Sequence, residues 1–336
     1  MQRGGFGALV TMTGPERRGA GTKTISGGQR SAKNLPLWPV PSQFPFSLRF
    51  MTPTRPLILV SNDDGITAPG IRHLVEIVQA LGAEVVVVAP DAPQSGMGHA
   101  ITIGHPLRLA KNLVFGPDVE AYECSGTPAD CVKIAKHYVL KDRTPDLVVS
   151  GINHGSNASV NVLYSGTMSA AIEAAIEGLP AVGFSLCEYG PNADFSHVAK
   201  WVSQVCRHAL EHGVPAGTAL NVNIPKNSDT PIAGLRLGRQ ARAKWQEEFD
   251  RRLDPYQRPY YWLIGSFVNL DHGTDTDEWA LANNYVSVVP CQFDLTAHPG
   301  LAQLSTQWQL PLPEAIQVPA PPQPVASGDY GPAALG

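Results

Sequence analysis

Between residues 57 and 224, short apolar β-branched runs alternate with helix-spaced apolar residues, and this alternation is the strongest constraint on the fold. The runs typical of strands are 57–61, 84–89, 146–150, 181–185 and 219–224; the patterns typical of helices are 70–81, 127–140, 167–177 and 195–212. Strands separated by helices are joined by right-handed crossovers. The sequence therefore predicts an α/β fold with a doubly wound, mostly parallel sheet.

The helix predicted at 127–140 has a recognisable start. Thr127 is expected to be its N-cap, and Pro128 follows at the first helical position, where a missing N–H costs nothing.

The pattern changes beyond about residue 235. Residues 239–254 are highly charged, 259–264 and 285–290 resemble strands, and 275–283 resembles a helix. This region is too small to build a core of its own. We expect it to pack on the main sheet or on another subunit.

Both ends of the chain differ in composition from the middle. Residues 1–50 carry seven basic side chains and one acid, a charge of +6, and are rich in Gly, Ser, Thr and Pro. Such a segment is expected to be disordered, and Met51 is the preferred start of the working protein. Residues 310–336 are rich in proline and are expected to form a disordered tail. The domains expected are thus a catalytic domain at 56–235 and an oligomerisation region at 236–301.

Charge and cysteine content narrow the class of protein. The whole chain has a net charge of −4, which leaves −10 after the basic leader, and an acidic body argues against binding a nucleic-acid polymer. No apolar run approaches the ~20 residues that a membrane span needs. Five scattered cysteines without a CxxC pair suggest neither a disulfide framework nor a zinc site. A cytoplasmic protein without a membrane partner is expected.

The strongest local feature is the adjacent pair Asp63 and Asp64, directly after the first predicted strand. The carboxyl ends of parallel strands face the ligand crevice of such sheets. Adjacent carboxylates repel each other, and a divalent cation that prefers oxygen ligands, such as Mg²⁺ or Mn²⁺, relieves that repulsion. The structural alternative is a turn in which Asp63 caps the following helix.

Two further loops are expected at the same edge of the sheet. Ser95 offers a hydroxyl after the second predicted strand, and Gly96 beside it lets backbone amides approach an anion. Asn153 offers a carbonyl oxygen after the strand at 146–150. Ordinary loop hydrogen bonding is the alternative for each residue taken alone.

A possible phosphate site precedes the helix at 167–177. Ser165, Gly166 and Thr167 combine hydroxyls with free amides at a helix N-terminus, where the helix dipole favours an anion. The alternative is a plain N-cap by Ser165 or Thr167, without any ligand.

Taken together, ordered motifs over about residues 56–301 resemble the SurE survival-protein family of 5′/3′-nucleotidases. They are ILVSNDDG at 58–65, APG at 68–70, VAP at 88–90, QSG at 94–96, GTPADC at 126–131, SGINHG at 150–155, YSGT at 164–167, NVNIP at 221–225 and DLTAH at 294–298. The chain departs from the family where Ser61 replaces a common Thr and where 159–163 replaces a stretch that is often acidic.

The resemblance implies a Rossmann-like domain, a carboxyl-terminal part exchanged between subunits, and a homodimer or homotetramer. It implies a phosphomonoesterase (5′-nucleotidase, EC 3.1.3.5) that acts on nucleoside 5′- and 3′-monophosphates, with exopolyphosphatase activity in some members. By position, Asp63, Asp64, Ser95 and Asn153 match the family's ligands for one divalent metal ion per subunit.

Our mechanistic hypothesis is that this cation lowers the pKa of a water that attacks the phosphate in line, with Asp63 and Asp64 as the catalytic carboxylates and 165–167 holding the phosphate. Direct attack by Asp63 is disfavoured, because carboxylate-nucleophile phosphatases use alternating Asp-x-Asp acids. His99, His154 and His298 are candidates for a general acid by residue type, and none is assigned that role. The alternative from another class is a noncatalytic nucleotide-binding regulatory protein on the same fold.

Overall fold

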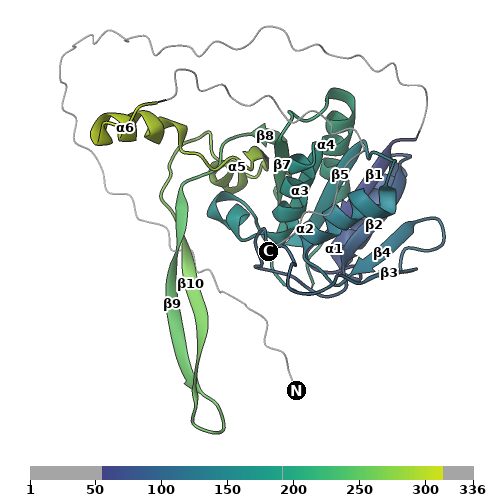
Figure 1. Cartoon of the computed structure of the whole chain (residues 1–336), viewed down its shortest axis with the longest axis horizontal. Coiled ribbons are helices and arrows are strands. Elements are labelled where there is room, and N and C mark those ends of the chain that lie inside the picture. The colour runs from purple at the N-terminus through teal and green to yellow at the C-terminus, as the bar shows by residue number, and fades with distance from the viewer. Residues whose placement is uncertain (1–54, 191, 313–336) are drawn as a thin grey trace. The chain divides into compact units, whose positions relative to one another are not determined.

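A computed structural model describes residues 55–190 and 192–312 (Figure 1). The predictions for residues 1–50, for Met51 and for the tail beyond residue 312 lie outside the described residues. A nine-stranded sheet in the order β3-β4-β2-β1-β5-β6-β7-β11-β8 forms the centre of the described chain.

The middle of this sheet is parallel, as predicted. Its strands are β1 (Leu57–Ser61), β2 (Glu84–Pro90), β4 (Glu120–Cys124), β5 (Leu147–His154), β6 (Ala181–Cys187) and β7 (Thr218–Pro225). β2 lies on one side of β1 and β5 on the other, so the strand order reverses between β1 and β5. In open α/β sheets, ligands bind outside the carboxyl ends of the strands at such a reversal.

Helices cover both faces of the sheet (Figure 1). Because side chains of a strand alternate, Ile58 and Val60 of β1 face one layer and Leu57 and Leu59 face the other. The first layer holds α1 (Pro69–Ala80) and α4 (Val198–His212), and the second holds α2 (Pro128–Ile134) and α3 (Gly166–Ile176). This arrangement confirms the predicted doubly wound α/β class.

The start of α2 agrees with its sequence signals. Thr127 is the N-cap, its hydroxyl accepts a hydrogen bond from the Asp130 backbone at 3.2 Å, and the Asp130 carboxylate accepts one from the Thr127 backbone at 2.9 Å. This reciprocal pair is a capping box. The helix continues as a π-helix over Ala135–Leu140, which completes the predicted span.

One predicted strand end was placed too early. The strand predicted at 146–150 extends as β5 to His154, with a shift in register between Ser150 and Asn153. The apolar run stops at Ser150, so the periodicity alone gave no sign that the backbone continues to pair. Asn153 therefore belongs to the end of a strand and not to a loop.

The chain beyond residue 235 returns to the main sheet. β8 (Leu235–Leu237) begins at the predicted domain boundary, α5 (Asp277–Ala282) follows later, and β11 (Val286–Gln292) pairs antiparallel with β7. The division into a catalytic and an oligomerisation region stays a prediction.

Between β8 and α5 the chain forms a long antiparallel hairpin, β9 (Ala243–Leu253) with β10 (Pro259–Asn269). Figure 1 shows that it projects away from the nine-stranded sheet. The strand predicted at 259–264 is longer than expected. Its partner β9 was not predicted as a strand, because its segment of the sequence is highly charged. Other elements were not predicted: the short edge strand β3 (Leu109–Lys111), the strands β4 and β8, and α6 (His298–Trp308), which buries none of its residues.

No helix among the described residues has the length and apolar character that a membrane crossing requires. All five cysteines are free thiols.

Candidate functional site

The two adjacent aspartates lie where β1 ends. Ser61 is the last residue of β1 and is in register with Ser150 of β5, so the Asn62, Asp63 and Asp64 that follow stand at the reversal point of the sheet. Asp63 is buried, with 4% of its surface exposed, whereas Asp64 is partly exposed.

Asp63 is bonded to the start of α3 and not to that of α1. The Thr167 hydroxyl donates a short hydrogen bond to Asp63 Oδ1. The alternative of Asp63 as a cap of α1 is therefore wrong, since Ala68 is the N-cap of α1 and no side chain caps it. Burial and the neighbouring charge of Asp64 raise the pKa of Asp63 to about 6, and the hydrogen bonds from Thr167 offset only part of that rise.

The close approach of Asp63 to α3 depends on Gly166. A Cβ atom added at Gly166 would lie 2.6 Å from Asp63 Cβ, which is closer than real atoms come. Any larger residue would push the carboxylate and the helix apart. Ser165 is the N-cap of α3, and its hydroxyl accepts a hydrogen bond from the Met168 backbone at 3.0 Å. The plain capping role proposed as an alternative for Ser165 is thus present.

Asp64 has a basic neighbour at the end of β5. His154 Nδ1 lies 3.1 Å from Asp64 Oδ2, and the imidazole also packs edge-on against Phe195, with ring centroids 5.0 Å apart. His154 is therefore held in place by a carboxylate on one side and an aromatic ring on the other.

The loop that carries Ser95 and Gly96 is tied to the same place by backbone hydrogen bonds. The Gln94 N–H donates to the Asp63 carbonyl at 2.7 Å, and the Gly98 N–H donates to the Tyr164 carbonyl at 3.2 Å. Ser95 and Gly96, between these two anchors, are exposed. The structure thus holds Gln94, the residue before Ser95, against the backbone of Asp63, while Ser95 itself is exposed.

Asn153 presents one free oxygen at this edge. Its amide nitrogen donates to the Gly155 carbonyl at 2.9 Å, which fixes the side chain. Among the residues that the structure describes, none donates a hydrogen bond to Asn153 Oδ1. That oxygen is available to a ligand.

The donors at this edge fit a hard divalent cation. Asp63, Asp64, Ser95 and Asn153 offer only oxygen atoms, the ligand type that Mg²⁺ and Mn²⁺ select. No Lys or Arg of the described chain forms an ion pair with either aspartate, so the buried charge of Asp63 has no basic partner. The buried Asn62 Oδ1 also lacks a hydrogen-bond partner. A cation would satisfy these groups.

A buried ion-pair cluster beside the Ser95 loop was missed by the sequence analysis. Glu173 of α3, 2% exposed, accepts from Lys133 Nζ at 2.6 Å and lies 2.8 Å from His99 Nε2. Its pKa is lowered, because the hydrogen bonds from His99 and Lys133 outweigh burial. The three residues come from a loop and two helices, so no local pattern could have linked them.

His298, the third histidine considered as a general acid, contacts a different carboxylate. His298 Nε2 lies 3.1 Å from Asp294 Oδ2, and both side chains are about half exposed. These two residues form an i,i+4 pair that involves none of the four predicted ligands.

The fold and this site define the class of the protein. It is a doubly wound α/β protein with oxygen donors where the strand order of the sheet reverses, next to a helix N-terminus. The family described as "Survival protein SurE" matches residues 58–247. The chain belongs to the SurE family, as its motifs indicated.

Similar proteins cover most of the chain. "5′-nucleotidase SurE" of Cytophaga hutchinsonii is 64% identical over 256 residues, which are 76% of this chain and 98% of that protein. "5′-nucleotidase SurE" of Christiangramia forsetii is 59% identical over 77% of this chain and 99% of its own length. The crystal structure of the SurE protein from Aquifex aeolicus matches with a TM-score of 0.64 and 38% identity, over 75% of this chain and all of that one. The names of these relatives agree with the predicted phosphoric monoester hydrolase.

Proposed function

We propose that the chain is a metal-dependent 5′-nucleotidase that hydrolyses nucleoside monophosphates to nucleoside and phosphate. The observation that carries this proposal is the buried carboxylate of Asp63, adjacent to Asp64 and without a basic partner, at the ligand edge of the sheet. The names of the curated relatives support the same activity.

Asp63, Asp64, Ser95 and Asn153 would hold one Mg²⁺ or Mn²⁺ ion, the cofactor that their oxygen atoms suit. When bound, such an ion supplies Lewis acidity toward the phosphate oxygens and a water of lowered pKa.

The chain's own residues position the reacting groups. Thr167 donates to Asp63 and favours its ionised form, so Asp63 can act as a ligand near neutral pH. The Thr167 hydroxyl already donates to Asp63, whereas the Ser165 hydroxyl only accepts, from the Met168 N–H, and can still donate. Within the proposed phosphate site at Gly96, Ser165, Gly166 and Thr167, the donors to a phosphate are therefore the Ser165 hydroxyl and backbone N–H groups.

The same site accounts for the wider activities that we propose. It recognises a terminal phosphate through an ion and backbone amides, neither of which reads the position of the ester. Hydrolysis of 3′-monophosphates and removal of terminal phosphates from polyphosphate are therefore proposed alongside the 5′ activity.

The experiment that tests this function measures phosphate release by the purified full-length chain. The substrates are a panel of nucleoside 5′- and 3′-monophosphates and polyphosphate, each with Mg²⁺, with Mn²⁺ and with a chelator. We expect release from 5′-monophosphates that the chelator abolishes and added metal restores. Binding of nucleotides without any turnover would favour the regulatory protein instead.

A rapid-quench experiment separates the two chemical routes. Water attack predicts no phosphorylated protein at any time during turnover of AMP. A phosphorylated Asp63 trapped on quenching would show that this carboxylate is the nucleophile.

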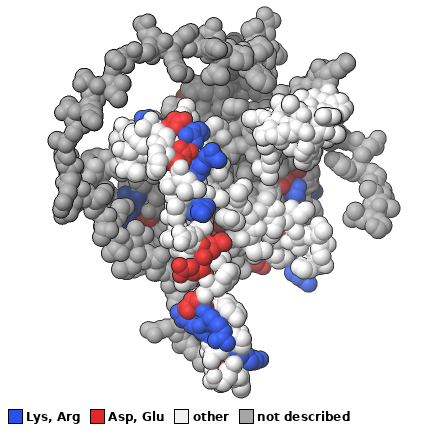
Figure 2. All heavy atoms as spheres, turned by 90° about the vertical axis from the view of Figure 1, so that its left-hand side faces the viewer, with Lys and Arg blue, Asp and Glu red and all other residues white. Residues whose placement is uncertain are grey.

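We also propose that the protein is a homodimer or homotetramer in the cytoplasm, assembled through the β9–β10 hairpin. Paired residues of antiparallel strands lie on the same face. One face therefore presents a set of large apolar side chains, most of them exposed: Trp245, Phe249, Leu253, Tyr261, Leu263 and Phe267. Figure 2 shows charged side chains of both signs among uncharged surface along this projection. An isolated two-stranded hairpin is marginally stable in water, so a second subunit is the fitting cover for its apolar face.

A further inference from the structure

A second group of metal-ligating side chains lies at the end of α4. Residues 208–212 read His-Ala-Leu-Glu-His, an H-x-x-E-H sequence on a helix, in which His208 and His212 are four residues apart and share one face. Metalloenzymes use two helical histidines at this spacing, with a glutamate next to one of them, to hold zinc.

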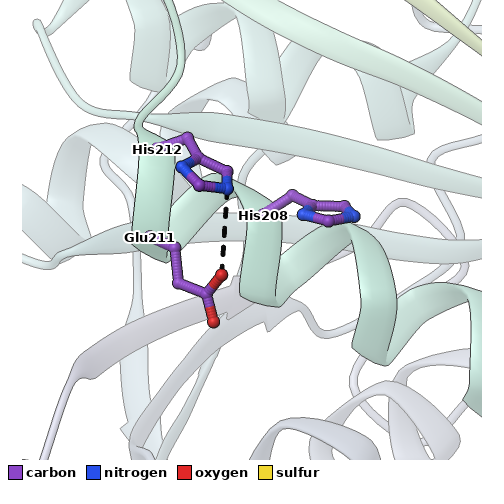
Figure 3. A group of neighbouring side chains, drawn as sticks. All are labelled: His208, Glu211 and His212. Carbon is purple, nitrogen blue, oxygen red and sulfur yellow. Dashed lines mark ion pairs between the residues drawn. The ribbon is translucent and has the colours of Figure 1, made fainter.

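The side chains are already gathered (Figure 3). The imidazole rings of His208 and His212 are stacked, with centroids 5.8 Å apart, and His212 Nε2 lies 3.8 Å from Glu211 Oε2. One ligand atom from each of the three residues lies within 4.8 Å of the other two. All three side chains are exposed, so an ion can reach them from solvent.

Nothing else in the described chain competes for these groups. Outside its ring contact with His212, His208 forms no hydrogen bond or ion pair with any described residue. The group also occupies the last turn of α4, where the unpaired carbonyls and the helix dipole favour a positive charge.

This group is at the opposite edge of the sheet from the proposed phosphate site. α4 leads from the carboxyl end of β6 to the amino end of β7, so its last turn lies beside the amino ends of the strands. Asp63 and Asn153 lie at the carboxyl ends. The ligand chemistry differs as well, because two imidazoles suit Zn²⁺, Ni²⁺ or Cu²⁺ better than Mg²⁺.

We infer that His208, Glu211 and His212 form a surface site for a borderline divalent transition-metal ion of the Zn²⁺ class. Two imidazole nitrogens and one carboxylate oxygen bind the ion, and water or a group from another molecule completes its coordination. The site is independent of the proposed nucleotidase function.

Calorimetric titration of the untagged full-length protein with Zn²⁺ tests this site. Excess Mg²⁺ is present to occupy oxygen-only sites, and the pH is about one unit above the ordinary histidine pKa of ~6.5. We expect one Zn²⁺-binding event whose affinity falls in His208→Gln and in His212→Gln by at least roughly tenfold, the lower end of what losing even an outer-shell partner costs a metal site. Hydrolysis of AMP should stay unchanged in both variants.

His73→Gln is the matched control. His73 lies 3.7 Å from Glu76 on α1, so it is also a helical histidine beside a glutamate, but without a second histidine. This variant should bind Zn²⁺ like the wild type. With Cu²⁺ in place of Zn²⁺, electron paramagnetic resonance should show coupling to two imidazole nitrogens, one of which is lost in His208→Gln. Unchanged Zn²⁺ affinity in both site variants, or a Cu²⁺ spectrum without nitrogen coupling, would overturn the inference.

Discussion

The surroundings of Asp63 stabilise its negative charge only in part. Burial and Asp64 oppose ionisation, while the hydrogen bonds from Thr167 favour it, and the balance leaves its pKa raised to about 6. Structural carboxylates that are buried usually have a basic partner. A site that keeps two acids adjacent and gives the buried one no such partner is suited to receive a cation.

Substitution of Gly166 tests the close contact between α3 and Asp63. In Gly166→Ala, the new methyl group would collide with Asp63 Cβ at 2.6 Å and displace the carboxylate. A misplacement of about 1 Å in a catalytic group can lower turnover on the order of 100-fold. We expect a loss of that size in phosphate release from AMP.

Gly104→Ala is the control for this substitution. An added Cβ at Gly104 meets no atom within 4 Å, so this variant should keep wild-type activity. Equal activity of Gly166→Ala and Gly104→Ala would show that the contact does not shape the site.

Glu278 gives the protein a pH-dependent stability. Burial and the neighbouring Asp277 raise the pKa of Glu278 to about 7, above its ordinary value of 4.5. The folded protein therefore retains this proton where the unfolded chain has released it, and stability falls as the pH rises from about 4.5 to about 7. Glu278→Gln should be more stable than the wild type above pH 7, on the order of 1 kcal/mol after allowance for partial exposure.

Denaturant melts at several pH values measure this difference. The two proteins should converge as the pH falls below 4.5, where Glu278 becomes protonated in the unfolded chain as well as in the folded protein. A constant gap between the two curves at all pH values would contradict the role of Glu278.

At the residue scale, the sequence indicated candidate site residues but not which residues contact one another. Asp63 and Asp64 were placed at a strand end because they directly follow an apolar run that is visible in the sequence, whereas the strand that contains Asn153 was predicted to stop at Ser150. The bond from Thr167 to Asp63 joins residues 104 positions apart, and no local pattern encodes it. For the same reason, the contacts of Glu173 with His99 and Lys133 were missed.

At the scale of elements, the Glu173 cluster holds the Ser95 loop against α3. His99 ends this loop region and is tied to a buried glutamate two turns into the helix that begins beside Asp63. Lys133 of α2 binds the same glutamate, so three elements meet at one carboxylate.

Loss of the Glu173 cluster should weaken the site indirectly, because Glu173 acts by holding the Ser95 loop against α3. In Glu173→Gln we expect metal affinity and phosphate release to fall about 10-fold to 100-fold, as for other partners that position metal ligands. Metal titrations of AMP hydrolysis measure both quantities.

Glu177→Gln is the matched control for Glu173→Gln. Glu177 follows one turn later in the chain and also contacts a lysine and a histidine, Lys136 and His137, but these belong to the π-helix and not to the Ser95 loop. A similar fall in both variants would mean that the effect is one of general stability.

The elements found from the sequence are those with a strong apolar period. β1 is a wholly buried five-residue strand, and α1 presents Ile71, Leu74, Val75 and Val78 to the core, so both were clear. β3 has only three residues, and six of the eleven residues of β9 are charged, so neither segment has the apolar run typical of a buried strand. These strands depend on pairing with a neighbour, which periodicity does not report.

At the scale of the whole molecule, the β9–β10 hairpin is the part whose apolar side chains the core of the chain does not bury. Its base is held by Trp245, whose Nε1 donates to Asn161 Oδ1 at 2.8 Å and whose ring packs on Phe267. Farther out, Phe249 and Leu263 are paired across the strands and remain 68% and 49% exposed. An apolar pair in this position fits contact with another subunit.

Charges placed on that apolar face should break the assembly. For Phe249→Glu with Leu263→Glu, sedimentation equilibrium should give a smaller oligomer than for the wild type. The control is Gln246→Glu with Ser266→Glu, a pair on the opposite face of the same hairpin, which should keep the wild-type mass. A wild-type mass for both double variants would exclude this face as the interface.

The central claim is that the carboxylates at the reversal of the sheet perform metal-dependent hydrolysis of nucleotides. The most direct test is phosphate release from AMP by Asp63→Asn in saturating Mg²⁺ or Mn²⁺, with circular dichroism and thermal melting to verify the fold. We expect a folded protein that releases no phosphate above the uncatalysed rate. A folded Asp63→Asn protein with wild-type activity would contradict this claim.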